Sequence, residues 1–501
     1  MHRSILIGIL VCFGTHTNLA LGFADDPIDV VTALETAVAD AIAKAQPSVV
    51  SITRIRSATG ETTAIRGQTS GRNDSTPSLF IQERPGFPNV GNPIDPESTR
   101  SIDAFPLPGD FGGGVIIGSK GEILTNYHLV KSAGQIRVRG AGFVFDAEIL
   151  AADPRSDLAV IAPRLGSSLP IQLKPLPVGD ADQLRQGSFL IALGNGFNAA
   201  RDGKASASLG ILSNVARKID PPADLDINMR RLFRFQPTLI QLDNRLNLGM
   251  SGAAVINIKG ELVALSTAGA SPAGYDAAAG YAIPMDVLGR RAVKELIQGK
   301  EVEYSFIGIT LDLTPNTVKD VQRGTPAFEA DLATGDRILE VGGKPLTDDE
   351  SALPLALALV PVGQPVALKV LHEGKVVERT MVMSKYPASE EERDDVIATN
   401  RPAPWRGARI DFASVLGDPR IFPRTLDVMS RGGVGVVEVS SGSIAEAAGV
   451  KKGVVIRAVG GKSVRTPAEF REAVKAFDGQ AVELTIVGEQ DDIQQVTVPP
   501  K

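Results

Sequence analysis

Cysteine and histidine are nearly absent from this sequence of 501 residues, which holds 1 cysteine and 4 histidines. Cys12 lies in an apolar run near the N-terminus, so disulfides and thiol catalysis are excluded from the rest of the chain. His128 and His372 are the histidines beyond that region. Because most zinc sites in proteins are built from cysteine and histidine, this small supply argues against a metal centre. We expect neither a metal nor a cofactor.

An excess of positive charge is absent too. Lysine and arginine number 52 against 58 aspartates and glutamates, for a formal net charge of −6. This balance argues against a nucleic-acid binder and against a basic membrane-surface protein. Aromatic residues make up only 5%, whereas 51 glycines and 33 prolines predict many turns and short strands. The chain length suggests about three domains.

The N-terminal segment has the layout of a secretory signal. Arg3 precedes a short apolar run from Ile5 to Phe13, and small residues stand before Asp25. We expect residues 1–24 to be a signal peptide cleaved after Ala24, with an uncleaved anchor as the alternative. The apolar run is too short to span a bilayer comfortably, and no later stretch is apolar enough to do so. The protein is therefore expected to be exported, to a periplasm or to the exterior.

The next part of the chain changes from a helical to a strand pattern. Apolar residues recur with a helical period over Asp29–Lys44, so residues 25–47 are expected to form an N-terminal helix. Residues 48–298 follow as a domain of short strands, which indicates antiparallel barrels or a sandwich. Its polar, proline-rich segment 57–110 is expected to be a long flexible loop, although composition alone also allows a linker between two domains. A helical pattern over Val287–Ile297 ends the domain.

The C-terminal part contains an internal duplication. Residues 299–386 and 405–499 share a small-residue turn, a helical turn, a strand and a Gly-Gly-Lys turn, which is Gly342-Gly343-Lys344 in the first copy and Gly460-Gly461-Lys462 in the second. Such self-similarity indicates a duplicated module. Between the copies the chain is charged and contains proline, so residues 387–404 are expected to be a solvated linker.

Three polar residues of the strand-rich domain could together support acyl transfer. Ser251 lies in Gly249-Met250-Ser251-Gly252, His128 ends an apolar strand, and Asp157 precedes another. Taken singly, they also fit a turn serine, a core or surface histidine and a turn aspartate. Acyl transfer by serine requires a base that takes the hydroxyl proton and an acid that holds this base in one tautomer. The chain order histidine, aspartate, serine is that of chymotrypsin. The other histidine, His372, lies in a hairpin turn and is expected to be solvated.

Several motifs in this region resemble those of the HtrA/Deg family of serine proteases. They are Leu124-Thr125-Asn126-Tyr127-His128, Ser156-Asp157-Leu158-Ala159-Val160, Leu209-Gly210-Ile211-Leu212-Ser213, Ile240-Gln241-Leu242-Asp243, Asn247 to Gly252 and Gly280-Tyr281-Ala282-Ile283-Pro284. The resemblance covers nearly the whole chain after the signal. It implies a mainly β architecture, with a chymotrypsin-like double β-barrel protease domain at 48–298 followed by two PDZ domains of α+β type at 299–386 and 405–499.

The resemblance also implies roles for single residues. His128 would be the general base, Asp157 its orienting acid and Ser251 the nucleophile. The backbone N–H groups of Gly249 and Ser251 would form the oxyanion hole. In the first PDZ domain, the loop at Ile307, Gly308 and Ile309 would hold the carboxylate of a peptide C-terminus.

The implied function is that of an exported serine endopeptidase that cleaves unfolded or damaged proteins in protein quality control. Its implied partners are unfolded polypeptides and C-terminal peptides, with no nucleic acid and no stable membrane span. The family resemblance also favours a homo-oligomer built from trimers.

Two departures from the family pattern keep a second function open. The family usually has Gly-Asn-Ser-Gly-Gly-Pro around its nucleophile, whereas this chain has Met250 before the serine and Ala253 in place of the second glycine. If that position requires a positive φ, alanine would strain it by roughly 1 kcal/mol or more. The alternative is therefore a latent or inactive chaperone or adaptor that binds peptides through its PDZ domains. The second PDZ loop, Trp405-Arg406-Gly407-Ala408, fits the peptide-binding pattern less well.

Overall fold

The computed structural model describes residues 27–56, 111–166, 173–195, 202–217, 239–244, 246, 249–267, 280–349, 352–387, 395–417, 432–488 and 492–501. The expected signal peptide at 1–24 and the expected loop at 57–110 lie outside these residues, so both remain predictions. None of the helices formed by these residues is both long enough and apolar enough to cross a membrane.

The first half of the strand-rich domain is a closed antiparallel barrel. Its strands are β1 (Val49–Arg56), β2 (Phe111–Ile116), β3 (Ile123–Asn126), β4 (Ala133–Gly140), β5 (Phe143–Asp153) and β6 (Leu158–Pro163). They are ordered β5-β4-β1-β2-β3-β6, and pairing of β5 with β6 closes the ring. In β4 alternate residues such as Ile136 and Val138 are buried and point into the barrel, whereas β2 and β3 are buried along their whole length. The short helix α2 (Tyr127–Val130) continues directly from β3.

The second half forms another closed barrel, so the expected double barrel is confirmed. Its strands are β7 (Phe189–Gly194), β8 (Ser206–Arg217), β9 (Leu239–Leu242), β10 (Ala254–Ile256), β11 (Leu262–Ser266) and β12 (Gly280–Pro284). The ring runs β10-β11-β12-β9-β8-β7. Residues of both barrels, such as Leu124 and Leu158 from the first and Ile191 and Leu265 from the second, share one buried cluster. The two barrels are thereby held at a fixed separation, with the ends of β3, β6 and β11 near their seam.

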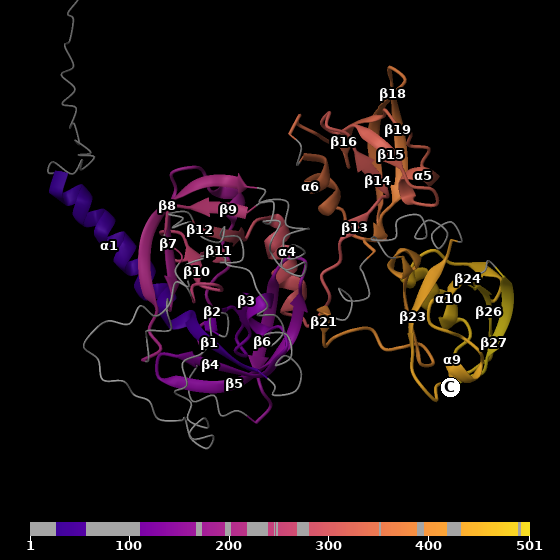
Figure 1. The fold of residues 1–501 in the computed structure, drawn as a ribbon, viewed down its shortest axis with the longest axis horizontal. Helices are drawn as coiled ribbons and strands as arrows, with labels where there is room; N and C mark the ends of the chain where they lie inside the picture. The colour runs from indigo at the N-terminus through magenta and orange to yellow at the C-terminus, as the bar shows by residue number, and fades with distance from the viewer. Residues whose placement is uncertain are drawn as a thin grey trace, which may run out of the picture.

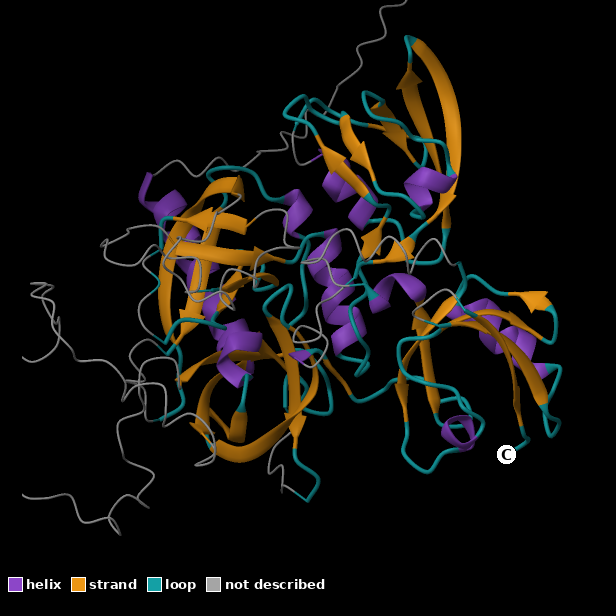
Figure 2. Cartoon of the chain, turned by 45° about the vertical axis from the view of Figure 1, so that its right-hand side comes forward, coloured by secondary structure: helices purple, strands orange, loops and turns teal. Residues whose placement is uncertain are grey.

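Two helices flank the barrels. Helix α1 (Pro27–Ala45) buries Ala41 and Ala45 in the cluster shared by the barrels, and its N-terminal half projects away from them (Figure 1). Helix α4 (Val287–Leu296) begins at Asp286, whose carboxylate caps it by accepting a hydrogen bond from Gly289 N at 2.8 Å. It lies between the barrels and the C-terminal modules (Figure 2). Both helices match the expected periodic segments.

The two C-terminal copies fold into separate modules, each with antiparallel strands, a short helix and a longer one. The first contains β13 (Ser305–Phe306), β14 (Ile309–Leu311), β15 (Val318–Val321), α5 (Pro326–Glu329), β16 (Arg337–Val341), β17 (Lys344–Pro345), α6 (Ala352–Ala358), β18 (Pro365–His372), β19 (Lys375–Val382) and β20 (Ser384–Lys385). The second contains β22 (Ala408–Phe412), β23 (Val434–Val439), α9 (Ile444–Ala447), β24 (Val455–Val459), β25 (Lys462–Ser463), α10 (Pro467–Lys475), β26 (Val482–Val487) and β27 (Ile493–Val498).

His372 is not a fully solvated turn residue, because its Nδ1 lies 2.7 Å from Asp336 Oδ1.

The expected solvated linker at 387–404 docks on the first barrel at Val396 to Ala398, whereas residues 399, 400 and 402–404 are exposed. There β21 (Ile397–Ala398) pairs antiparallel with β5 of the first barrel, and Val396 is buried. Thr399 donates from both its amide and its hydroxyl to Leu150 O, at 3.2 and 2.9 Å. The reason is that pairing of β5 with β4 ends at Ala147, so the backbone groups of β5 beyond it gain partners from an added strand. The charge and proline content of residues 387–404 cannot predict this pairing, because it depends on free backbone groups in another domain.

Candidate active site

His128 and Asp157 form a close pair at the seam of the barrels. The Nδ1 atom of His128 lies 2.8 Å from Asp157 Oδ2 and 3.0 Å from Asp157 Oδ1. The backbone N–H of His128 donates to the same Oδ1 at 3.0 Å. Since a carboxylate only accepts hydrogen bonds, Nδ1 carries the proton and Nε2 is left as the basic nitrogen. The Asp157 side chain is 0% exposed and that of His128 is 17% exposed, so the imidazole faces solvent from a buried anionic support.

Asp157 owes its position to a tight turn between β5 and β6. Its φ is +55°, a left-handed conformation that aspartate tolerates better than most residues. Its carbonyl accepts hydrogen bonds from Tyr127 N at 3.0 Å and from Asn126 Nδ2 at 3.3 Å, which ties the turn to the end of β3. Thr267, at the end of β11, donates its hydroxyl to Asp157 Oδ2 at 3.3 Å. The aspartate is therefore held by both barrels.

Ser251 lies in the loop that leads into β10, and the glycine strand β2 brings this loop next to α2. The carbonyl of Ser251 accepts a hydrogen bond from Gly113 N at 2.6 Å. A β-carbon added to Gly112 would lie 2.8 Å from Ser251 O and 2.4 Å from a methyl group of Leu129, which follows His128. Only glycine at this place lets the serine loop and the histidine helix approach the same strand so closely. The structure thus brings all three predicted residues to one region.

The two glycines around the serine adopt conformations that glycine favours. Gly249 has φ of +87° and Gly252 of +76°. An added β-carbon at Gly252 would lie 2.1 Å from Gly113 O, and one at Gly249 would lie 2.4 Å from the Phe111 ring. Substitution at either glycine would therefore disturb the backbone whose N–H groups were predicted to form the oxyanion hole.

Met250 and Ala253 are packed, and neither strains the loop through its φ. Ala253 is not among the residues with positive φ, so the strain considered from the sequence does not arise. Both side chains are buried in a small apolar cluster with Ala192 of β7. A β-carbon at Gly194 would lie 2.6 Å from Ala253 Cβ and 2.8 Å from Met250 Sδ. The missing side chain at Gly194 therefore provides the space that the two unusual residues fill.

Two further residues near the aspartate turn were not found from the sequence. Arg155 is buried, and its Nε donates to Asp153 Oδ1 at 2.7 Å. Although burial acts against its charge, the Asp153 and Glu301 carboxylates raise the pKa of Arg155. Burial, together with the Asp153 carboxylate, raises the pKa of Tyr304, whose hydroxyl donates to Asp153 Oδ2 at 2.5 Å. Tyr304 lies far along the chain from the turn, and no local pattern marks it.

The predicted peptide-binding loop of the first C-terminal module adopts a fixed shape. Ile307 is buried, and its carbonyl accepts a hydrogen bond from Ala327 N at 2.9 Å. Gly308 has φ of +82°, and a β-carbon there would lie 2.3 Å from the Thr325 side chain. Ile309 begins the strand β14, at which an added peptide strand would have to pair.

The matching loop of the second module is built differently. Arg406 has φ of +48°, and its guanidinium donates to Val498 O and Pro499 O, both at 2.7 Å, near the C-terminus. The backbone N–H of Ala408 donates to Trp405 O at 2.8 Å, so this group is already used inside the loop. The poorer fit of this loop to the peptide-binding pattern agrees with these internal hydrogen bonds, which use groups of the loop within the module itself.

No group of three or more aspartate, glutamate, histidine or cysteine side chains is placed to hold a metal ion in the described part of the chain. The chemistry that the site offers is that of a serine, an imidazole and a carboxylate.

Comparison with known proteins adds three matches to family patterns. The pattern of trypsin-like peptidase domains matches residues 112–265, and those of PDZ domains match residues 305–381 and 435–488. These matches agree with the double barrel and with the two C-terminal modules.

Relatives of known name align with most of the chain. A probable periplasmic serine endoprotease, DegP-like, of Chlamydia muridarum is 31% identical over 393 residues, which cover 75% of this chain and 72% of that protein. The periplasmic pH-dependent serine endoprotease DegQ of Escherichia coli is 30% identical over 389 residues, 74% of this chain and 77% of its own. The periplasmic serine endoprotease DegP of Salmonella typhimurium is 28% identical over 491 residues, 91% and 92% of the two chains. A solved structure, the HtrA-type protease AlgW with a tripeptide, aligns at 22% identity over 70% of this chain and 98% of its own, with a TM-score of 0.49.

Proposed function

Because this chain belongs to the HtrA/Deg family of serine endoproteases and is a serine-type endopeptidase, we propose that it cleaves peptide bonds through an acyl-enzyme formed on Ser251. His128 Nε2 takes the proton of the Ser251 hydroxyl and later returns it to the leaving amine. Asp157 holds the imidazole in the tautomer that makes this transfer possible. The observation that carries the proposal is the contact of both Asp157 carboxylate oxygens with His128 Nδ1, at 2.8 and 3.0 Å.

The oxyanion of the tetrahedral intermediate is assigned to the backbone N–H groups of Gly249 and Ser251. The left-handed φ of Gly249 supports this role, because it re-aims the peptide units on either side of it. The buried, unstrained packing of Met250 and Ala253 favours a working loop over the latent chaperone or adaptor.

The substrates are proposed to be unfolded or damaged proteins in the periplasm, where the named relatives are described as endoproteases. The loop at Ile307, Gly308 and Ile309 is proposed to hold the C-terminal carboxylate of a substrate chain, and the active assembly is proposed to be a trimer-based homo-oligomer.

The test is digestion of casein by the wild type and by the variants Ser251→Ala and His128→Ala. Turnover should fall by orders of magnitude in both variants, because each removes a member of the catalytic unit. The matched control is His372→Ala, which removes the histidine that pairs with Asp336 in the first PDZ domain and should retain activity. Equal activity in wild type and Ser251→Ala, or no labelling of Ser251 by a fluorophosphonate probe, would refute the protease mechanism.

The substrate class needs a separate measurement. A disulfide-bonded protein should resist cleavage while folded and be digested once it has been reduced and alkylated. Equal cleavage of the two forms would contradict a preference for unfolded chains while leaving the acyl-enzyme mechanism intact.

A further inference from the structure

The segment that leads from helix α4 into the first PDZ domain inserts a tyrosine beside the turn of Asp157. Tyr304 is 9% exposed, and its hydroxyl donates to Asp153 Oδ2 at 2.5 Å. Its ring lies 4.6 Å from the guanidinium carbon of Arg155, a distance typical of cation–π contact. Arg155 in turn donates from Nη2 to Val302 O at 2.7 Å. The segment and the turn therefore bind each other at several points.

Asp153 is the residue around which the catalytic turn is organised. It is fully buried, and its Oδ2 accepts hydrogen bonds from Ser156 N at 3.2 Å and from Ser156 Oγ at 2.8 Å. Arg155 Nε occupies Oδ1. These donors all belong to the turn that ends in Asp157, whereas the Tyr304 hydroxyl comes from outside the barrel.

The turn needs such support because of its backbone. Asp157 has a positive φ, which for a residue other than glycine persists only where the surroundings enforce it. A shift of the Asp153 carboxylate would be passed to Ser156 by its two hydrogen bonds and from there to the next residue, Asp157. The Asp157 carboxylate must keep its contact with His128 Nδ1, so a small displacement of the turn changes the orientation of the imidazole.

We propose that Tyr304 is a positioning residue for the catalytic aspartate, which it orients through Asp153 and Ser156 without touching the substrate. This inference rests on the proposed role of Asp157 in the acyl-enzyme mechanism. It assigns a function in the chemistry to the segment outside the barrels that connects them to the first PDZ domain.

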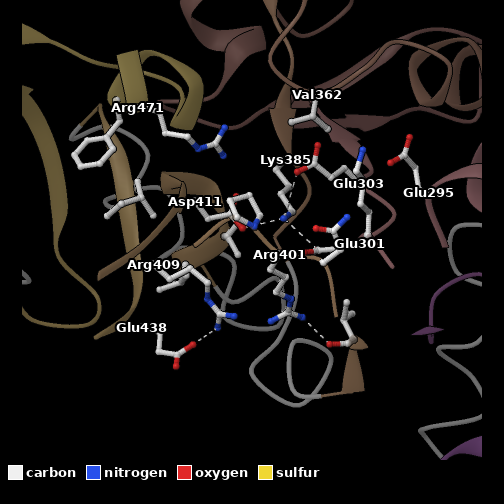
Figure 3. Close-up of a pocket in the computed structure, with 18 of the residues that line it drawn as sticks. Glu295, Glu301, Glu303, Val362, Lys385, Arg401, Arg409, Asp411, Glu438 and Arg471 are labelled. Atoms are coloured by element: carbon white, nitrogen blue, oxygen red, sulfur yellow. Dashed lines mark hydrogen bonds and ion pairs between the residues drawn. The ribbon is translucent and has the colours of Figure 1, made fainter. Parts of the chain in front are cut away.

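The segment itself is held by ion pairs around two buried cations, Arg155 and Lys385. Glu301 lies 3.7 Å from Arg155 Nη2 and 3.1 Å from Lys385 Nζ, and Lys385 Nζ lies 2.8 Å from Asp411 Oδ2 in the second PDZ domain (Figure 3). The Lys385 side chain is only 5% exposed. A buried cation depends on its carboxylate partners, so removal of one partner is costly and the arrangement is held. Tyr304 is therefore presented to Asp153 from an anchored backbone.

The test compares Tyr304→Phe with wild type in the full-length protein, using labelled casein and the rate at which a fluorophosphonate probe labels Ser251. We expect kcat and the labelling rate to fall about tenfold or more, with KM unchanged within about twofold, because a displaced catalytic group slows the chemistry without altering substrate contacts. Ser305→Ala is the matched control. It removes a hydroxyl from the next residue, which donates to Leu357 O at 2.7 Å in the PDZ domain and not to the turn, so its kcat should equal that of wild type.

A double-mutant cycle that combines Tyr304→Phe with Ser156→Ala tests whether Tyr304 acts on Asp157 through Asp153 and Ser156. If both hydroxyls act by holding the same Asp153 oxygen, the two losses in kcat should not multiply in the double variant. A kcat of Tyr304→Phe equal to wild type, or an equal loss in Ser305→Ala, would overturn the positioning role while leaving the protease mechanism intact. If Ser251→Ala digested casein as fast as wild type, the proposed mechanism and this inference would both fail.

Discussion

Gly194→Ala is the substitution from which we expect the most informative response. A β-carbon at this position would lie 2.6 Å from Ala253 Cβ and 2.8 Å from Met250 Sδ. Carbon atoms in contact prefer about 3.5–4.0 Å, so the overlap with Ala253 is about 1 Å. The methionine thioether can rotate away, but the alanine β-carbon can move only with its backbone. The loop that carries Ser251 must therefore shift.

The expected magnitude has two parts. Overpacking of a tight core costs about 1–3 kcal/mol of stability. A shift of about 1 Å in a catalytic group can cost about a hundredfold in rate, so the loss in kcat should exceed the loss expected from partial unfolding. The φ of Gly194 is not in the left-handed region, so the effect would arise from contact and not from backbone strain.

The assay is a double-mutant cycle that compares Gly194→Ala, Ala253→Gly and the double variant. Ala253→Gly removes the β-carbon that the new methyl group at position 194 would contact. Alone, Ala253→Gly should cost about 1 kcal/mol, since glycine gains more backbone freedom on unfolding and a buried methyl is lost. Combined with Gly194→Ala it should restore most of the lost activity and stability, measured by casein turnover and by urea unfolding. Additive effects of the two substitutions, or full activity of Gly194→Ala alone, would refute the reasoning.

Three further outcomes follow from contacts described above. Thr267→Val removes the hydroxyl that donates to Asp157 Oδ2 and should lower kcat about tenfold with little change in KM, as measured on labelled casein; an unchanged kcat would contradict support from the second barrel. Thr399→Pro removes the amide and hydroxyl donors to Leu150 O and should accelerate nicking between the PDZ domains in limited proteolysis, while equal rates would show that β21 does not hold the segment. Gly308→Ala would strain a φ of +82° against Thr325 and should abolish binding of a peptide with a free C-terminus in a fluorescence assay, with the amidated peptide as the control; retained binding would remove the loop from the peptide site.

A strand-rich domain and the three candidate site residues could be predicted because their signals are local. His128 follows an apolar strand, Asp157 precedes one, and Ser251 lies between glycines, so each motif is contained in a few neighbouring residues. Short strands with turn signals predicted barrels or a sandwich, and the resemblance to the HtrA/Deg family narrowed this to a double barrel. The repeated Gly-Gly-Lys turn predicted the duplicated modules.

The contacts that were missed join distant parts of the chain. Tyr304 reaches Asp153 across a separation of 151 residues, and Thr267 reaches Asp157 across 110. The packing of Ala253 also depends on a distant residue, because the absence of a side chain at Gly194 leaves room for the Ala253 methyl group. The linker at 387–404 was expected to be solvated because composition measures average polarity, whereas its docking depends on an open strand edge in another domain.

Pairing of β21 with β5 limits the range of positions that the first PDZ domain can take relative to the protease barrels. The chain leaves the protease barrels at the segment around Glu301 and pairs with the first barrel again at Ile397. The first PDZ domain is therefore attached to the protease domain on both its N-terminal and its C-terminal side. A domain on one flexible tether explores a wide volume, whereas one held at both ends is restricted to a narrow arc. A polypeptide captured by its C-terminus in that domain would be presented to Ser251 at high effective concentration. Chain length upstream of the captured end, more than affinity, would then decide which bonds reach the serine.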